Sequence, residues 1–122
     1  MFVNENPAQA GEAMRQLTAA QAPIVVVLIE QDGCPACEQF HPIFTGLATP
    51  YARAGLPFVQ VDASTPDPEA QAWMALHGVT ATPTVLVVQR FRGAIGKLEG
   101  VSTPVDTRRL LDTALANNRR PS

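Results

Sequence analysis

Cys34 and Cys37 are the residues of this chain whose type and spacing point most directly to chemistry. They are the only two cysteines in 122 residues, and they stand three positions apart. A pair this close could perform redox chemistry, bind a metal or form a structural crosslink. A disulfide across so short a loop constrains the unfolded chain little, so a structural crosslink explains the pair least well. The spacing therefore predicts redox or metal chemistry.

The residues on either side place this pair between a strand and a helix. The apolar, mostly β-branched run at 24–29 ends shortly before the pair and predicts a strand that is buried on both faces. Apolar residues at helical spacing follow the pair and predict a helix from Cys34 to about Arg53. Pro42 falls inside this helix, where it should interrupt the hydrogen bonding and kink the axis.

The start of a helix favours a thiolate, because the first N–H groups have no intrahelical partner and the helix dipole makes this end positive. With Cys34 as the N-cap, Pro35 takes the first helical position, and the N–H groups of Ala36 and Cys37 can point at the Cys34 sulfur. Such a position lowers a cysteine pKa from ~8.5 to between ~3.5 and ~7.5. We therefore expect Cys34 to be the nucleophile and Cys37 to be the less exposed residue that closes a disulfide with it.

Zinc binding is the alternative to redox chemistry. His41 lies four residues after Cys37, so Cys34, Cys37 and His41 could converge on one ion. A closed structural zinc site needs a fourth ligand. The sequence has no third cysteine, and His77 belongs to a different predicted helix. We therefore predict that the protein binds no metal.

The remaining elements alternate between strands and helices. In order, we expect an edge strand at 2–3, a helix from Pro7, a strand at 58–62, a helix from about 66 to 77, strands at 84–89 and 94–99, and a helix from about 103 to 116. The strand–helix–strand–helix–strand order of 24–89 predicts parallel strands with right-handed crossovers, followed by an antiparallel hairpin. A chain of 122 residues, 46% of them hydrophobic, predicts a single domain over 1–122.

Charge and hydropathy argue against two classes of partner. The formal net charge is −2, and no cluster of Lys and Arg exceeds two adjacent residues, so we expect no binding to nucleic acid. The longest apolar run, 24–29, is too short to span a bilayer, and no basic segment precedes an apolar core near the N-terminus. We expect no membrane partner, a cytoplasmic location and a monomer.

Three features together resemble the thioredoxin superfamily. They are Cys34-Pro35-Ala36-Cys37 after a hydrophobic strand, Pro42 five residues beyond the second cysteine, and the segment 78–85 that contains Thr82-Pro83. The resemblance covers nearly the whole chain. It implies a thioredoxin-like three-layer α/β/α fold, in which a central mixed sheet of about five strands is flanked by about four helices.

The resemblance also implies a substrate groove beside the cysteines. In this family the proline that matches Pro83 follows a cis peptide bond, lies against the cysteine pair and leaves the backbone of the preceding residue, here Thr82, free to pair with an extended substrate. The groove residues that we expect are Gly33, Pro35, Ala36, Thr82, Pro83 and Gly100.

This sequence departs from thioredoxins at several positions. Gly33 stands where thioredoxins usually have tryptophan. Pro35-Ala36 stands between the cysteines where thioredoxins usually have Gly-Pro, and Cys-Pro-x-Cys is closer to the glutaredoxin pattern. The family's buried aspartate and its lysine align with Leu28 and Phe58, so both charges of the usual proton relay are missing. Alternate residues of a strand share a face, so Glu30 lies on the face of Leu28 and is the candidate base for Cys37. The alternative is that Glu30 points into solvent.

The function implied by the resemblance is that of a thiol–disulfide oxidoreductase that reduces disulfides of protein substrates. Cys34 would attack, Cys37 would resolve the mixed disulfide, and no cofactor would be needed, because electrons enter and leave as thiols. A separate reductase, a flavin enzyme of the thioredoxin-reductase type, would restore the dithiol. One alternative is a glutaredoxin-like protein that glutathione recycles, and the other is a module that binds a partner protein through the groove.

Overall fold

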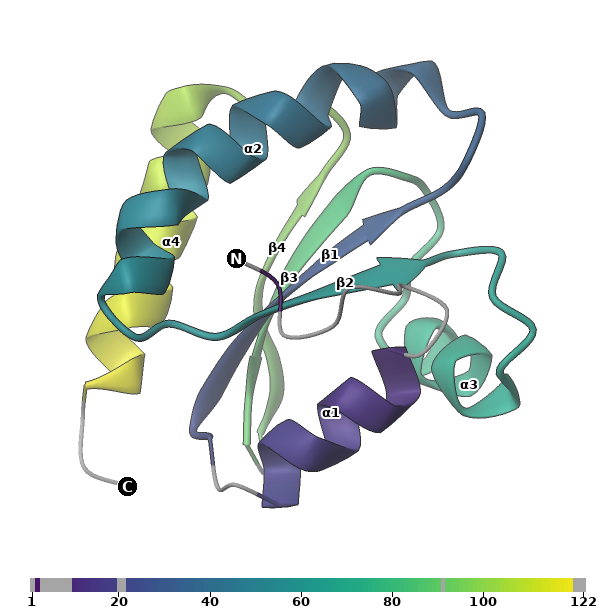
Figure 1. The fold of residues 1–122 in the computed structure, drawn as a ribbon, viewed down its shortest axis with the longest axis horizontal. Coiled ribbons are helices and arrows are strands. Elements are labelled where there is room, and N and C mark those ends of the chain that lie inside the picture. Colours follow the sequence, from purple (N-terminus) through teal and green to yellow (C-terminus); the bar gives the residue numbers. More distant parts are fainter. Residues whose placement is uncertain (1, 3–9, 20–21, 91, 120–122) are drawn as a thin grey trace.

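A four-stranded sheet lies between two pairs of helices in the computed structural model, which describes residues 2, 10–19, 22–90 and 92–119 (Figure 1). The elements are α1 (Ala10–Ala19), β1 (Ile24–Glu30), α2 (Pro35–Arg53), β2 (Phe58–Asp62), α3 (Pro68–Leu76), β3 (Thr84–Gln89), β4 (Gly93–Glu99) and α4 (Pro104–Asn118). The expected three-layer α/β/α architecture with a mixed sheet and four helices is therefore confirmed.

The strand order is β2-β1-β3-β4, with β1 at the centre beside both β2 and β3. β1 is parallel to β2 but antiparallel to β3, and β3 is antiparallel to β4. The expected parallel arrangement is therefore wrong for β3. Glu30 pairs with Asp62, and Ile29 pairs with Thr84, so the last residues of β2 and the first residues of β3 lie at the same end of the sheet. The segment that contains α3 carries the chain past β1 to the position of β3, but it keeps the chain at the end of the sheet where β2 finishes.

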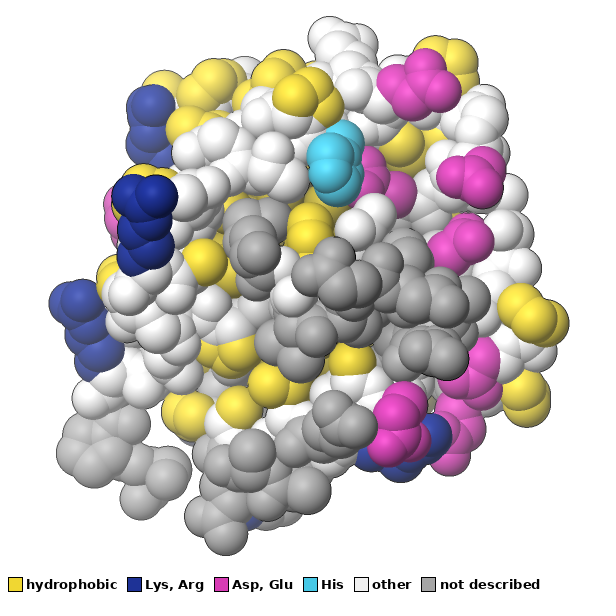
Figure 2. Space-filling view, viewed as in Figure 1, with side chains coloured by type: hydrophobic (Ala, Val, Ile, Leu, Met, Phe, Trp, Pro, Cys, Tyr) yellow, Lys and Arg dark blue, Asp and Glu magenta, His cyan; other side chains and the backbone are white. Residues whose placement is uncertain are grey.

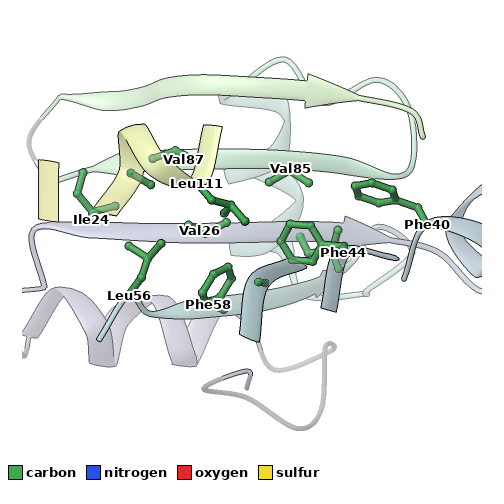
Figure 3. Packing of buried hydrophobic residues seen from close by; sticks show 12 residues of the cluster. Ile24, Val26, Phe40, Phe44, Leu56, Phe58, Val85, Val87 and Leu111 are labelled. Atoms are coloured by element: carbon green, nitrogen blue, oxygen red, sulfur yellow. The ribbon is translucent and has the colours of Figure 1, made fainter. Parts of the chain in front are cut away.

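The central strand β1 divides the core into two halves, because successive side chains of a strand point to opposite faces. All seven of its residues are buried. Val26 and Leu28 pack toward α2 and α4 in a cluster that includes Phe44 (Figure 3). Val27 and Ile29 belong to a second cluster on the side of α1 and α3. This burial on both faces is what the run at 24–29 predicts.

Three of the four helices begin with a capping residue that is followed by proline, at Cys34, Asp67 and Thr103. In each case the capping side chain accepts a hydrogen bond from a backbone N–H of the first turn. The proline suits the first helical position, since its missing N–H would have no intrahelical partner. Cys34 therefore occupies a position that an oxygen-bearing side chain occupies in α3 and α4.

Two expectations differ in detail from the structure, and a third falls on residues that the structure does not describe. The described sheet has four strands where about five are expected, because Phe2 forms only an isolated bridge to Phe58, while Val3 lies outside the described residues. The expected start of the first helix at Pro7 also lies outside them. α2 continues through Pro42, which has no N–H to bond the carbonyl of Glu38, so the missing hydrogen bond does not end the helix, and the helix bends along its length (Figure 1).

Candidate active site

The two cysteines lie at the junction of β1 and α2 and form a disulfide, with their Cα atoms 5.2 Å apart. Gly33 has φ of 73°, a left-handed conformation that glycine adopts without the steric cost borne by other residues. This turn brings Cys34 into the N-cap position, where its backbone is extended. The backbone N–H of Cys37 then donates a hydrogen bond to the Cys34 Sγ atom at 3.1 Å.

The two sulfur-bearing residues differ in exposure. Cys34 is half-buried, whereas Cys37 is only 4% exposed. Pro35 is exposed beside the pair, and Ala36 is half-buried. A substrate disulfide can therefore approach Cys34 more easily than Cys37.

The segment before β3 lies against Cys34. The Thr82–Pro83 peptide bond is cis, and Pro83 is buried. The Thr82 hydroxyl donates a hydrogen bond to Cys34 Sγ at 3.5 Å, and the Thr82 carbonyl oxygen lies 3.7 Å from the same sulfur. Gly100 joins this region, because its N–H donates to the Pro83 carbonyl at 2.8 Å. Residues far apart in sequence thus surround the accessible sulfur.

A groove of about 370 Å³ borders this segment on the side of α3. Its lining includes Gln31 after β1, Met74 of α3 and the run 79–82 that leads to Pro83. The backbone of Thr82 therefore lies between the sulfur of Cys34 and an open surface.

Glu30 is buried at the end of β1 and does not point into solvent, so the alternative orientation is wrong. Its Oε1 atom lies 2.6 Å from the Nδ1 atom of His41 in α2 and accepts a hydrogen bond from Nε2 of Gln60 in β2 at 2.9 Å. Leu28 faces α2, and Glu30 continues that face by one strand period. From the sequence, His41 is predicted only as a possible metal ligand, and Gln60 carries no signal of its own.

A cleft of about 400 Å³ connects this cluster to the second cysteine. Its lining residues are Glu30, Gln31, Asp32, Gly33, Cys37, Glu38, His41, Gln60, Val61 and Asp62. Figure 2 shows acidic side chains on the side of the molecule where β1 and β2 end and α2 begins. A sequence signal for His41 did exist, because residues four apart in a helix are neighbours and His41 follows Cys37 by four.

The two positions that align with the family's charged pair are apolar and fully buried. Leu28 and Phe58 belong to the same core cluster, which is packed by α2 and α4. Neither can take up a proton, so any proton acceptor for Cys37 has to come from another position.

The described residues contain no group of three or more His, Cys, Asp and Glu side chains arranged to hold a metal ion. His41 contacts Glu30, and the two cysteines are bonded to each other. Within the described part of the chain, no helix has the length and apolar character needed to cross a membrane.

Comparisons with known proteins agree with this geometry. The family model of the thioredoxin-like domain matches residues 10–115, so the chain belongs to the thioredoxin-like family. A search of curated proteins found no match by sequence. The family membership confirms the resemblance to the thioredoxin superfamily.

Solved thioredoxin structures share the fold. The reduced thioredoxin pre-protein of Schistosoma mansoni is 20% identical, with a TM-score of 0.68 over 85% of this chain and 90% of its own. Fasciola hepatica thioredoxin is 20% identical, with a TM-score of 0.67 over 86% and 93%. Mitochondrial thioredoxin 3 of Saccharomyces cerevisiae is 22% identical, with a TM-score of 0.64 over 84% and 89%.

Proposed function

We propose that this protein is a thiol–disulfide oxidoreductase that reduces disulfides of protein substrates. One observation carries the proposal: an accessible helix-capping Cys34 is bonded to a buried Cys37 and lies against the backbone of Thr82. A substrate disulfide can reach the sulfur of Cys34, whereas the buried sulfur of Cys37 can react only with Cys34. Two unequal thiols of this kind suit a reaction in two steps.

In the first step the Cys34 thiolate attacks one sulfur of the substrate disulfide. A bond forms between Cys34 Sγ and that sulfur, the substrate disulfide breaks, and the other substrate sulfur leaves as a thiolate that takes a proton from water. The N–H of Cys37 and the hydroxyl of Thr82 both donate to Cys34 Sγ, and such donors favour the thiolate.

In the second step Cys37 loses its proton and attacks Cys34 Sγ. The mixed disulfide breaks, the substrate leaves as its second thiolate, and the Cys34–Cys37 disulfide forms. Two electrons have then passed from the protein to the substrate. The groove beside Thr82 supports an extended polypeptide as substrate. We expect that polypeptide to contact Gly33, Pro35, Ala36, Pro83 and Gly100 as well.

Trapping the mixed disulfide tests this proposal. Cys37→Ser should accumulate a covalent adduct with disulfide-containing proteins, and dithiothreitol should reduce this adduct. The matched Cys34→Ser variant should accumulate none. In the reduced wild type, iodoacetamide should modify Cys34 much faster than Cys37 at neutral pH, because only Cys34 is both accessible and held by donors. Equal alkylation rates, or an adduct that forms through Cys37, would contradict the assignment.

The partner that restores the dithiol is a second part of the proposal. A flavin reductase is the partner that we expect, and the Cys-Pro-x-Cys sequence makes glutathione the alternative. The rate at which a flavin reductase reduces the oxidised protein should differ clearly from the rate at which glutathione reduces it. A partner-binding module would require no thiol chemistry, so biological activity that survives replacement of both cysteines by serine would favour that alternative. Monomeric state and cytoplasmic location stay predictions.

A further inference from the structure

The second step of the proposed reaction requires that a buried thiol lose its proton. Cys37 is only 4% exposed, and both family positions that would supply charge are apolar here. Burial in apolar surroundings disfavours a thiolate. A group that accepts the proton and passes it to solvent would remove this obstacle, and the cleft beside Cys37 contains such groups.

We propose that Glu30 and His41 form a proton relay that carries the proton of Cys37 to solvent, with Gln60 as a positioning residue. This inference rests on the proposed function. The Glu30 carboxylate receives the proton through water in the cleft that it shares with Cys37, and His41 passes it outward.

The geometry distinguishes the two oxygen atoms of Glu30. His41 and Gln60 both contact Oε1, at 2.6 and 2.9 Å, and within the described part of the chain neither a hydrogen bond nor an ion pair involves Oε2. Oε2 is therefore the oxygen available to water in the cleft. The volume of about 400 Å³ far exceeds the roughly 30 Å³ that one water occupies.

His41 suits the outer end of the relay. The Glu30 side chain is 10% exposed, whereas the His41 side chain is 41% exposed. An imidazole has two ring nitrogens, so it can accept a proton at one and release it from the other. A proton shared across the contact between Glu30 and Nδ1 of His41 therefore has a route from the buried carboxylate to solvent.

The other ionisable side chains at the cleft are less suited to this role. From the described elements these are Asp32 in the turn after β1, Glu38 in α2 and Asp62 in β2. Asp32 and Glu38 are exposed. The Asp62 carboxylate accepts hydrogen bonds from the N–H and the hydroxyl of Ser64 in the following turn. Only Glu30 combines burial with a direct contact to a half-exposed histidine.

The proton balance of the step follows from this arrangement. The Cys37 S–H bond breaks, and its electron pair forms the new bond to Cys34 Sγ while the bond from Cys34 to the substrate sulfur breaks and the substrate leaves as a thiolate. The proton moves to Glu30 and then through His41 to water. When a reductase later opens the Cys34–Cys37 disulfide, Cys37 leaves as a thiolate and must regain a proton. The same relay then runs in the opposite direction.

A chromogenic aromatic disulfide separates the two steps in a stopped-flow experiment on the reduced full chain. Attack by Cys34 releases one coloured thiolate, and resolution by Cys37 releases a second. Glu30→Gln keeps the size of the side chain but cannot take up the proton. It should slow the second release by ~10²–10⁴-fold at neutral pH, the range typical of general-base assistance, and leave the first release unchanged. The deficit should shrink only well above pH ~8.5, the pKa of an ordinary thiol, because burial disfavours the thiolate of Cys37 and this thiol ionises without help only at higher pH.

His41→Asn provides a second variant at a less buried position. It should slow the second release less than Glu30→Gln does, and the double variant should be no slower than Glu30→Gln alone, because a relay acts as one unit. Glu38→Gln is the matched control, since it removes a charge from the same cleft without touching the Glu30–His41 pair, and both phases should match wild type.

Three outcomes would overturn the inference. They are a second release by Glu30→Gln within twofold of wild type across the pH range, an equal loss in Glu38→Gln, or equal slowing of both phases. A wild-type protein that releases no coloured thiolate at all would overturn the proposed function itself, which distinguishes the two failures.

Discussion

The Thr82 side chain offers a direct test of the proposed activation of Cys34. Its hydroxyl donates a hydrogen bond to Cys34 Sγ at 3.5 Å, and the N–H of Cys37 donates to the same atom at 3.1 Å. The backbone donor cannot be removed by a side-chain substitution. Thr82→Val removes the hydroxyl alone and keeps the branched shape of the side chain, so the loss of one donor can be measured while the other remains.

The size of the effect follows from the worth of one hydrogen bond. A neutral hydrogen bond contributes a net ~0.5–1.5 kcal/mol, and bonds to charged groups contribute more. We take the neutral range, because cysteine sulfur is a weak hydrogen-bond acceptor. One pH unit in a titration midpoint corresponds to ~1.4 kcal/mol, so the midpoint of Cys34 alkylation should rise by ~0.4–1.1 units. The direction is upward because the lost donor stabilised the thiolate more than the thiol.

The assay is the rate of iodoacetamide modification of Cys34 as a function of pH, measured in the reduced Cys37→Ser background so that only one thiol reacts. Thr80→Val is the matched control, because Thr80 is exposed in the same segment and no contact joins it to Cys34 among the described residues. A midpoint in Thr82→Val that equals that of the parent protein, or an equal shift in Thr80→Val, would refute the assignment of Thr82 as a donor to the reactive sulfur.

Two further predictions concern the packing that holds the site. Phe44→Ala should lower the free energy of unfolding in urea by ~3–5 kcal/mol, because the ring is fully buried between Phe40 and Phe58, with centroids 5.7 and 6.0 Å away; a loss below ~1 kcal/mol would contradict the packing. Tyr51→Phe should cost ~0.5–1 kcal/mol near neutral pH, since it removes the hydrogen bond that links α2 to Asp112 of α4 in a half-exposed position. Burial and this carboxylate raise the pKa of Tyr51 from 10.0 to about 12, so the stability due to the neutral phenol is complete below pH 10.0 and is lost as pH rises toward 12, a loss that Tyr51→Phe should not show.

Local patterns in the sequence were sufficient to predict most of the elements. Proline after Cys34, Asp67 and Thr103 marks three helix starts, because each proline occupies the one position where its missing N–H costs nothing. The unbroken apolar run of β1 predicts a central strand, since only a strand covered on both faces can bury every side chain. The same local reasoning placed Cys34 at the helix cap with Cys37 one turn inside.

The direction of β3 could not be predicted in this way. A helical segment between two strands usually carries the chain back to the opposite end of the sheet, so that the next strand is parallel, and hydropathy does not distinguish this from a connection that stays at the same end. The structure places the end of β2 and the start of β3 at the same end of the sheet, on either side of the last residues of β1. This arrangement brings Thr82 beside Cys34, so the groove next to Thr82 depends on a strand direction that is set only when the sheet assembles.

The cluster at the cleft depends on tertiary structure for the same reason. Strand periodicity put Glu30 on the face of Leu28, and helix periodicity put His41 one turn after Cys37, so each face could be derived alone. The contacts of Glu30 with Gln60 and with His41 also depend on the register of β1 against β2 and on the position of α2 over the sheet. Local spacing determines which face a side chain takes within its own element. Which faces meet is decided by long-range packing, and a buried carboxylate finds its hydrogen-bond partners only there.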